Sequence, residues 1–389
     1  MFNYIFFLRP PPTHASPAGP VTFTPQLAND LRTEDFTGEE EIFYSWSLVS
    51  PTVSEPYPTI TPPQKLTVWR SSNFKEFSVP LSPRARDGQA YRLVLTARQH
   101  ARAHIVNLAA RDVGERPFPV MSMPIVLSSR ARAGAHAEKQ QSIERVYRVP
   151  LQAEKDGFLT VREQTSFDLD KKVWDSGVGL SSWLVELAHQ RTPGDGEHQL
   201  IAHAREALFS STRCRVVELG AGTGIVSLTL AALRSAQVTH GDGCIFTTDL
   251  NSALPLLSHN VSTNSALFKE PFRPQPLALD WDEERLPDEV LAVEGGFDVI
   301  VMADVTYNTA SFPALVCTLS SLLRLSLPDH PPVVVLGYKE RDPEERTLWD
   351  MARDIGVSFE RVGERIGAGR DPVEIWLGMY ESRPQGRPI

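Results

Sequence analysis

Residues 216–224 read VVELGAGTG, and this stretch decides the fold. A short β-branched run ends at a glycine-rich turn, and the apolar pattern of residues 225–233 (IVSLTLAAL) has helical spacing. The stretch therefore predicts a strand, a tight loop and a helix N-terminus. Glycines let the backbone approach a ligand closely and adopt positive φ without steric cost. This is the arrangement in which α/β proteins bind nucleotide-like ligands.

The spacing of the glycines distinguishes between cofactors. A dinucleotide fingerprint G-x-G-x-x-G/A beginning at Gly220 requires a small residue at position 225, where this chain has Ile225. The pattern E-x-G-x-G-x-G, which begins at Glu218, is instead similar to motif I of S-adenosylmethionine-dependent methyltransferases. For the glycines alone, an ordinary strand-to-helix turn is the alternative interpretation.

An acidic residue at the end of the next predicted strand supports a ribose-containing ligand. Residues 245–249 (IFTTD) end in Asp249, which lies 25 residues after Gly224. The acid that binds a ribose hydroxyl in α/β folds is expected about 20 residues after the glycines. Asp249 is also placed to cap a helix that begins near Asn251. Asp249 and the glycine turn together favour the ribose interpretation.

Length and composition limit the classes of protein. The chain has 389 residues, enough for two domains or for one large domain with an extension. A net charge of −9 argues against a dedicated nucleic-acid-binding protein, which is usually basic. No stretch approaches the ~20 apolar residues of a membrane span. Cys214, Cys244 and Cys317 show no metal-ligand spacing and are expected in the core. We therefore expect a cytoplasmic protein, with the nucleus as a second location.

The N-terminal part of the chain differs from the rest in composition and sequence pattern. Residues 1–145 are proline-rich with short strand-like runs, which predicts a β-rich, partly disordered N-terminal extension. Residues 128–141 (SSRARAGAHAEKQQ) predict a basic, flexible linker. Arginines concentrated in residues 84–132 indicate either a solvated surface, which is favoured, or a site for RNA or an acidic partner.

Residues 146–389 alternate between strand-like and helical patterns. Alternation of this kind predicts a doubly wound, mostly parallel sheet that binds its ligand at the carboxyl ends of the strands. Beyond an initial hairpin, strands are expected within residues 216–219, 245–249, 299–303, 333–338 and 373–379.

Chemistry-bearing residues follow several of these strands. The near-continuous apolar strand at residues 298–303 (DVIVMA) is typical of a central parallel strand and leads directly to Asp304 and Tyr307. Residues 279–281 (LDW) lie just before that strand, and residues 337–341 (GYKER) end the next one. We expect these segments to meet at one edge of the sheet.

Taken together, the segments VWDSG, ELGAGTG, TTDL, LDW, ADVTY and YKERDP resemble the seven-β-strand lysine methyltransferases called methyltransferase family 16. Within the family, the resemblance is to enzymes that trimethylate a lysine of the valosin-containing AAA ATPase. It covers about residues 147–380 and implies a seven-stranded, Rossmann-like methyltransferase sheet. It also implies S-adenosyl-L-methionine as cofactor, no metal, and transfer of a methyl group to a protein lysine. The candidate substrates are an AAA ATPase or another cytosolic chaperone or translation protein.

The resemblance assigns roles to residues at matching positions. The cofactor contacts comprise a tryptophan, the glycine turn with its preceding glutamate, the ribose-binding acid, a tryptophan beside the adenine and an alanine that closes the pocket. These are Trp174, Glu218, Gly220, Ala221, Gly222, Asp249, Trp281 and Ala303.

Asp304 and Tyr307 form a D-x-x-Y motif that the resemblance places at the opening for the lysine. A carboxylate raises the pKa of a nearby lysine, whereas the attacking amine must be neutral. We therefore interpret Asp304 and Tyr307 as residues that bind and orient the amine. A small-molecule N- or O-methyltransferase and a non-catalytic S-adenosylmethionine-binding scaffold remain the alternatives.

Overall fold

The strand that ends in the glycine turn, β13, is an inner strand of a seven-stranded sheet with the order β15-β14-β13-β16-β17-β19-β18. In this computed structural model the first five strands of that order pair in parallel, and β19 pairs antiparallel with both β17 and β18. The predicted doubly wound, mostly parallel seven-stranded sheet is confirmed. The strands are β13 (Arg213–Leu219), β14 (Asp242–Asp249), β15 (Pro274–Ala278), β16 (Val299–Ala303), β17 (Val333–Tyr338), β18 (Val357–Arg365) and β19 (Val373–Tyr380).

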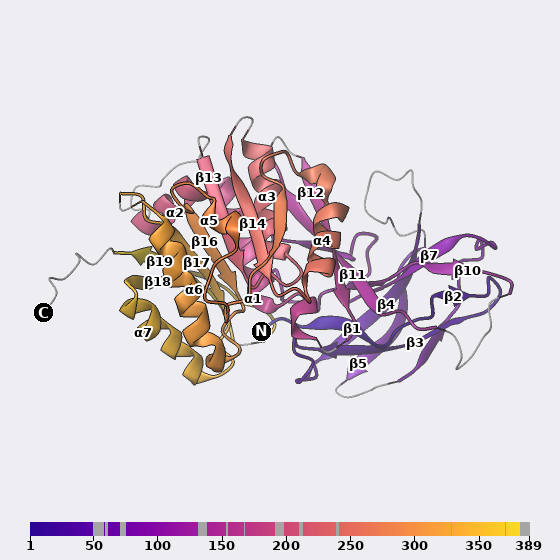
Figure 1. The fold of residues 1–389 in the computed structure, drawn as a ribbon. Coiled ribbons are helices and arrows are strands. Elements are labelled where there is room, and N and C mark those ends of the chain that lie inside the picture. The colour runs from indigo at the N-terminus through magenta and orange to yellow at the C-terminus, as the bar shows by residue number, and fades with distance from the viewer. Residues whose placement is uncertain are drawn as a thin grey trace, which may run out of the picture. The chain divides into compact units, whose positions relative to one another are not determined.

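Helices cover both faces of this sheet, as the two sides of β13 show (Figure 1). Glu218 faces α3, where its carboxylate accepts a hydrogen bond from Ser227. Val217 and Leu219, which alternate with it, belong to an apolar cluster that includes Leu315 of α6. The helices are α1 (Asp175–His189), α2 (Gln199–Phe209), α3 (Ile225–Gln237), α4 (Leu254–Thr263), α5 (Asp288–Leu291), α6 (Phe312–Leu325) and α7 (Thr347–Asp354), with short 3₁₀ helices at η1 (Leu169–Lys171), η2 (Ser265–Leu267), η3 (Thr309–Ser311) and η4 (Pro343–Arg346).

The N-terminal strands form two further sheets. One has the order β1-β3-β6, and the other is a nine-stranded sheet built on β12-β11-β9-β7-β10-β2. Side chains of both sheets, such as Phe7 and Trp46, share one apolar cluster. The strands are β1 (Tyr4–Arg9), β2 (His14–Ala15), β3 (Val21–Ala28), β4 (Glu39–Leu48), β5 (Gln64–Arg70), β6 (Phe77–Val79), β7 (Ala90–Thr96), β8 (Ile105–Asn107), β9 (Val120–Ser122), β10 (Ile125–Leu127), β11 (Ser142–Pro150) and β12 (Asp156–Gln164).

The chain divides into two compact units that are not contiguous in sequence. The first contains residues 1–148, 158–172 and 366–370, and the second contains the remainder. Sequence analysis placed one boundary at residue 145. In the structure the first unit also takes in most of β12, because β12 pairs with β11. The structure describes residues 1–49, 58, 61–70, 75–130, 138–152, 155–166, 168–190, 198–209, 213–238, 241–327, 329–369 and 371–381. Residues 131–137 of the expected linker lie outside the described residues.

The structure bears on the cysteines, on membrane-spanning helices and on metal ligands. Cys214 is buried, but Cys317 is exposed on α6, so the prediction that all three cysteines lie in the core is wrong for Cys317. No helix among the described residues is both long and apolar enough to span a bilayer. The described side chains also contain no group of three His, Cys, Asp or Glu residues suited to hold a metal ion.

Candidate functional site

The turn after β13 is built from glycines in the left-handed region. Gly220, Gly222 and Gly224 have φ values of 67°, 55° and 81°. A Cβ on Gly220 would lie 2.9 Å from Cγ1 of Val305, so a side chain there would displace the segment after β16. The turn is closed by the Gly224 N–H, which donates to the carbonyl of Ala221 at 2.8 Å. Glycine is therefore required both by conformation and by space.

Asp249 reaches this turn from the end of β14. Its Oδ2 accepts a hydrogen bond from the Gly222 N–H at 2.7 Å, and its Oδ1 accepts one from the Leu250 N–H at 2.7 Å. The side chain is half-buried. A carboxylate accepts hydrogen bonds from hydroxyl groups, so the side chain has the chemistry to bind a ribose. The structure thus joins Asp249 to the glycine turn, as a ribose-binding site requires.

Glu218 lies beneath the turn and points into the protein. Its Oε2 accepts hydrogen bonds from the Ser227 N–H at 3.2 Å and from the Thr247 hydroxyl at 3.3 Å, and the Ser227 hydroxyl also donates to it. Burial raises the pKa of Glu218 to about 7. The bonds tie β13 to the first turn of α3 and so support the glycine turn. A direct contact with the cofactor stays a prediction.

Trp281 and Ala303 border the same turn. Cζ2 of Trp281 lies 3.4 Å from the position of a Cβ on Gly220, and the indole is partly buried against the sheet cluster. Ala303 is half-buried at the end of β16, opposite Gly337 of β17. The structure therefore gathers the glycine turn, Asp249 and Trp281 at the carboxyl edge of the sheet.

Trp174, Tyr307 and Arg341 form a stack at the ends of three elements. The rings of Trp174, which precedes α1, and Tyr307 are parallel within 2°, with centroids 6.4 Å apart. The guanidinium carbon of Arg341 lies 5.1 Å from the centroid of the Trp174 ring. Tyr307 is 51% exposed, so its ring is open to a binding partner.

Asp304 is held by the protein on both oxygens. Its Oδ2 accepts from the Ser176 N–H of α1 at 2.8 Å, and its Oδ1 accepts from Nη2 of Arg341 at 2.8 Å. Its backbone has φ 56°, an uncommon value for a residue other than glycine, which costs about 1–3 kcal/mol unless the surroundings enforce it. Asp304 therefore fixes the position of neighbouring segments.

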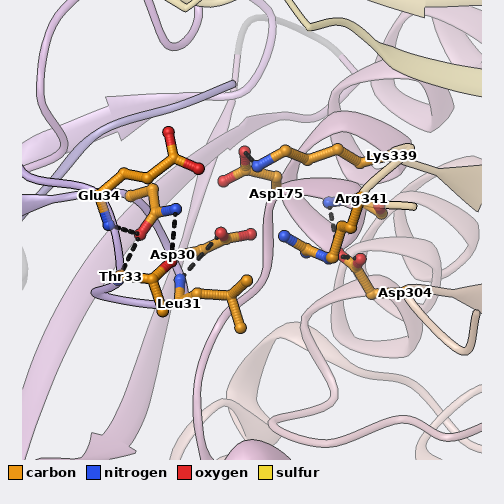
Figure 2. A network of polar contacts seen from close by, with 10 residues as sticks. Asp30, Leu31, Thr33, Glu34, Asp175, Asp304, Lys339 and Arg341 are labelled. Carbon is orange, nitrogen blue, oxygen red and sulfur yellow. Dashed lines mark hydrogen bonds and ion pairs between the residues drawn. The ribbon is translucent and has the colours of Figure 1, made fainter. Parts of the chain in front are cut away.

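A second buried ion pair lies beside Asp304 and Arg341 (Figure 2). Nζ of Lys339 is 2.7 Å from Oδ2 of Asp175, and both side chains are almost fully buried. Sequence analysis quoted the segments VWDSG and GYKER but assigned no role to Asp175, Lys339 or Arg341. Nothing in the sequence indicates which of its many charges pair across 164 and 37 positions.

These groups fit S-adenosylmethionine. The turn has no Cβ at Gly220, the Asp249 carboxylate is bonded to the same turn, and the Trp281 indole lies next to it. Ala221 lies in this turn, Glu218 lies just before it, and Ala303 ends β16, which pairs with β13. A contact of Trp174 with the cofactor stays a prediction. When bound, the cofactor supplies an electrophilic methyl group on a sulfonium.

Comparison with known families gives a match over the second unit. A family model described as "Lysine methyltransferase" matches residues 153–354, just over half of the chain. The matched range contains every predicted site residue from Trp174 to Tyr307, and also Lys339 and Arg341.

Several protein-lysine methyltransferases match part of the chain. The Saccharomyces cerevisiae protein-lysine N-methyltransferase EFM6 is 27% identical over 47% of this chain and 68% of its own length. The protein N-lysine methyltransferase METTL21A of Danio rerio is 40% identical over 37% of this chain and 58% of its own length. The EEF1A lysine methyltransferase 3 of Xenopus tropicalis is 36% identical over 28% of this chain and 41% of its own length. The chain thus spans from less than half to about two thirds of these relatives.

Proposed function

Because the chain belongs to the lysine methyltransferase family, we propose that it transfers a methyl group from S-adenosylmethionine to a lysine of a protein substrate. The observation that carries the proposal is the hydrogen bond between Gly222 and Asp249 at the carboxyl edge of the sheet. This bond joins the turn after β13 to the end of β14, and β16, which leads to Asp304 and Tyr307, ends beside β13 at the same edge.

The residues of the chain account for most of what this reaction needs. Methyl transfer forms an N–C bond while the C–S bond breaks in line with it, and the amine then loses a proton to solvent. Correct placement of the two reactants alone supplies about 7–11 kcal/mol of such a barrier. The glycine turn and Asp249 position the cofactor, whereas Tyr307, which is 51% exposed, presents an aromatic ring to the alkyl chain and ammonium of a lysine.

For the substrate we propose a translation factor, with an AAA ATPase as the second candidate. The support is the name of one relative, an EEF1A lysine methyltransferase, together with the motif resemblance to enzymes acting on the valosin-containing AAA ATPase. We also propose the cytoplasm as the location, with the nucleus as the second site. A fluorescent fusion of the full chain excluded from both compartments would contradict this location.

The test is tritium transfer from labelled S-adenosylmethionine to purified EEF1A, to the valosin-containing AAA ATPase and to whole-cell extract. We expect one labelled protein that yields methyl-lysine on hydrolysis. Gly222→Arg should abolish the label, since a side chain at φ 55° distorts the turn and blocks the cofactor. Asp288→Asn, which alters an exposed ion pair, should not.

Three other results would each point away from protein-lysine methylation in a different way. Label confined to small molecules would favour a small-molecule methyltransferase. Tight cofactor binding measured by calorimetry, without transfer to any protein, would favour a non-catalytic scaffold. No cofactor binding would contradict the proposed function altogether.

A further inference from the structure

Asp304 is a carboxylate whose charge is compensated within the protein. Nη2 of Arg341 lies 2.8 Å from Oδ1, and the exposed fractions of the two side chains are 4% for Asp304 and 12% for Arg341. The Ser176 N–H occupies Oδ2. Since the pair is shielded from water, its attraction is screened less than that of a surface ion pair.

Other charged groups near Asp304 have partners of their own. From the loop after β17, Lys339 pairs with Asp175 of α1, which leaves that second pair neutral as well. From η4, Glu345 is buried and accepts from the Thr306 hydroxyl at 3.5 Å and from the Arg341 N–H at 3.4 Å. Burial is the main cause that raises the pKa of Glu345, and Asp304 raises it further.

The compensation of the Asp304 charge by Arg341 matters for a lysine substrate. Only the neutral amine attacks a methyl group, and an unpaired carboxylate within about 4–6 Å of an ammonium raises its pKa by about 1–3 units. Each unit of that rise makes the neutral amine about tenfold scarcer below its pKa. An uncompensated Asp304 at the lysine opening would therefore oppose the reaction.

We propose that Arg341 is a positioning residue that neutralises Asp304 and thereby keeps the substrate lysine from being held as an ammonium ion. The inference rests on the proposed lysine methylation. Arg341 is placed for this role because its guanidinium contacts the Asp304 carboxylate and the Trp174 ring at once, and Trp174 stacks with Tyr307. The Arg341 side chain thus contacts both the charged residue of the D-x-x-Y motif and the aromatic pair formed by Trp174 and Tyr307.

The test is the pH dependence of kcat/KM on the protein that the wild type labels. In Arg341→Gln, Asp304 keeps its charge and loses its cation, so the acidic limb of the profile should move up by about one pH unit or more. Activity should then recover towards the wild-type value at high pH. Arg341→Lys, which keeps the positive charge, should retain most of the wild-type profile.

The double variant Asp304→Asn/Arg341→Gln separates charge from architecture. Asn can still accept from the Ser176 N–H but carries no charge, so the acidic limb should return to its wild-type position. Arg353→Gln removes the same charge from an exposed pair with Asp350 and should leave the profile unchanged.

A loss of kcat/KM that is equal at every pH in Arg341→Gln, and not reversed in the double variant, would overturn the inference and leave a purely architectural role. Calorimetric Kd values for S-adenosylmethionine and thermal unfolding identify variants that have lost cofactor binding or the fold. Absence of methyl-lysine with the wild type would instead contradict the proposed function itself.

Discussion

The N–H of Gly222 donates a 2.7 Å hydrogen bond to Oδ2 of Asp249, so the turn after β13 and the end of β14 are fixed to each other. Preorganisation of this kind lowers the entropy that a ligand loses on binding. The bond also predicts how the site responds to substitution of the acid.

Asp249→Ala should weaken S-adenosylmethionine binding by about 10- to 100-fold, because hydrogen bonds to a charged group contribute about 1.5–3 kcal/mol. Asp249→Asn keeps an acceptor for the Gly222 N–H and should fall between Ala and the wild type. Isothermal titration calorimetry measures both affinities. Asp288→Asn, on an exposed helix, serves as the control, and equal affinities for all four proteins would contradict the role of Asp249.

Gly220→Ala should lower both the stability and the affinity for the cofactor. A residue with Cβ at φ 67° is strained by about 1–2 kcal/mol, and the added Cβ would lie 2.9 Å from Val305. Gly88→Ala is the matched control, since Gly88 has φ 80° but no atom within 4 Å of the added Cβ. We expect Gly88→Ala to lower the unfolding free energy alone. Thermal unfolding and calorimetry would contradict the argument if Gly220→Ala left the cofactor Kd unchanged.

Tyr307→Ala should raise the KM for the protein substrate more than Tyr307→Phe does. The ring of Tyr307 stacks with Trp174, and aromatic pairs contribute about 0.5–1.5 kcal/mol beyond area burial, equivalent to roughly 2- to 12-fold. Steady-state kinetics with saturating cofactor measure the difference. A Phe variant as impaired as the Ala variant would show that the hydroxyl, rather than the ring, carries the role.

Glu218 should make the free energy of unfolding depend on pH. Its pKa is raised from about 4.5 to about 7 in the folded state, so between these values the folded protein binds more protons than the unfolded chain. The free energy of unfolding then falls as pH rises through this window, by at most about 3 kcal/mol. The Glu218→Gln variant lacks this dependence. In urea unfolding, its free energy of unfolding should exceed that of the wild type at pH 8 but not at pH 5. Parallel changes in both proteins would contradict the raised pKa.

Sequence patterns predicted five of the seven strands of the methyltransferase sheet and missed its two edges. β15 (PQPLA) contains two prolines, which are tolerated because an edge strand need not donate to a neighbour on its outer side. β18 (VSFERVGER) is mostly exposed, so it lacks the apolar run of a strand buried on both faces. Inner strands were predictable because both of their faces are covered.

The candidate site also contains some residues that the sequence predicts and others that it does not. The glycine turn and Asp249 follow from spacing along one βαβ unit, which the sequence contains explicitly. The pairing of Asp304 with Arg341, and of Asp175 with Lys339, depends on which strand ends are adjacent in the sheet. Such pairs are set by topology, so the sequence indicated charged residues without indicating their partners.

The discontinuity of the first unit constrains the order in which the chain folds during synthesis. Domains generally fold as units from the N-terminus while translation proceeds. Here the carbonyl of Met1 accepts from the N–H of Gly369, and the carbonyl of Gly114 accepts from the N–H of Ala368. These bonds cannot form until the ribosome has released nearly the whole second unit. The N-terminal β-unit is thus completed only after most of the second unit has been made, although its apolar cluster lies wholly within residues 5–143.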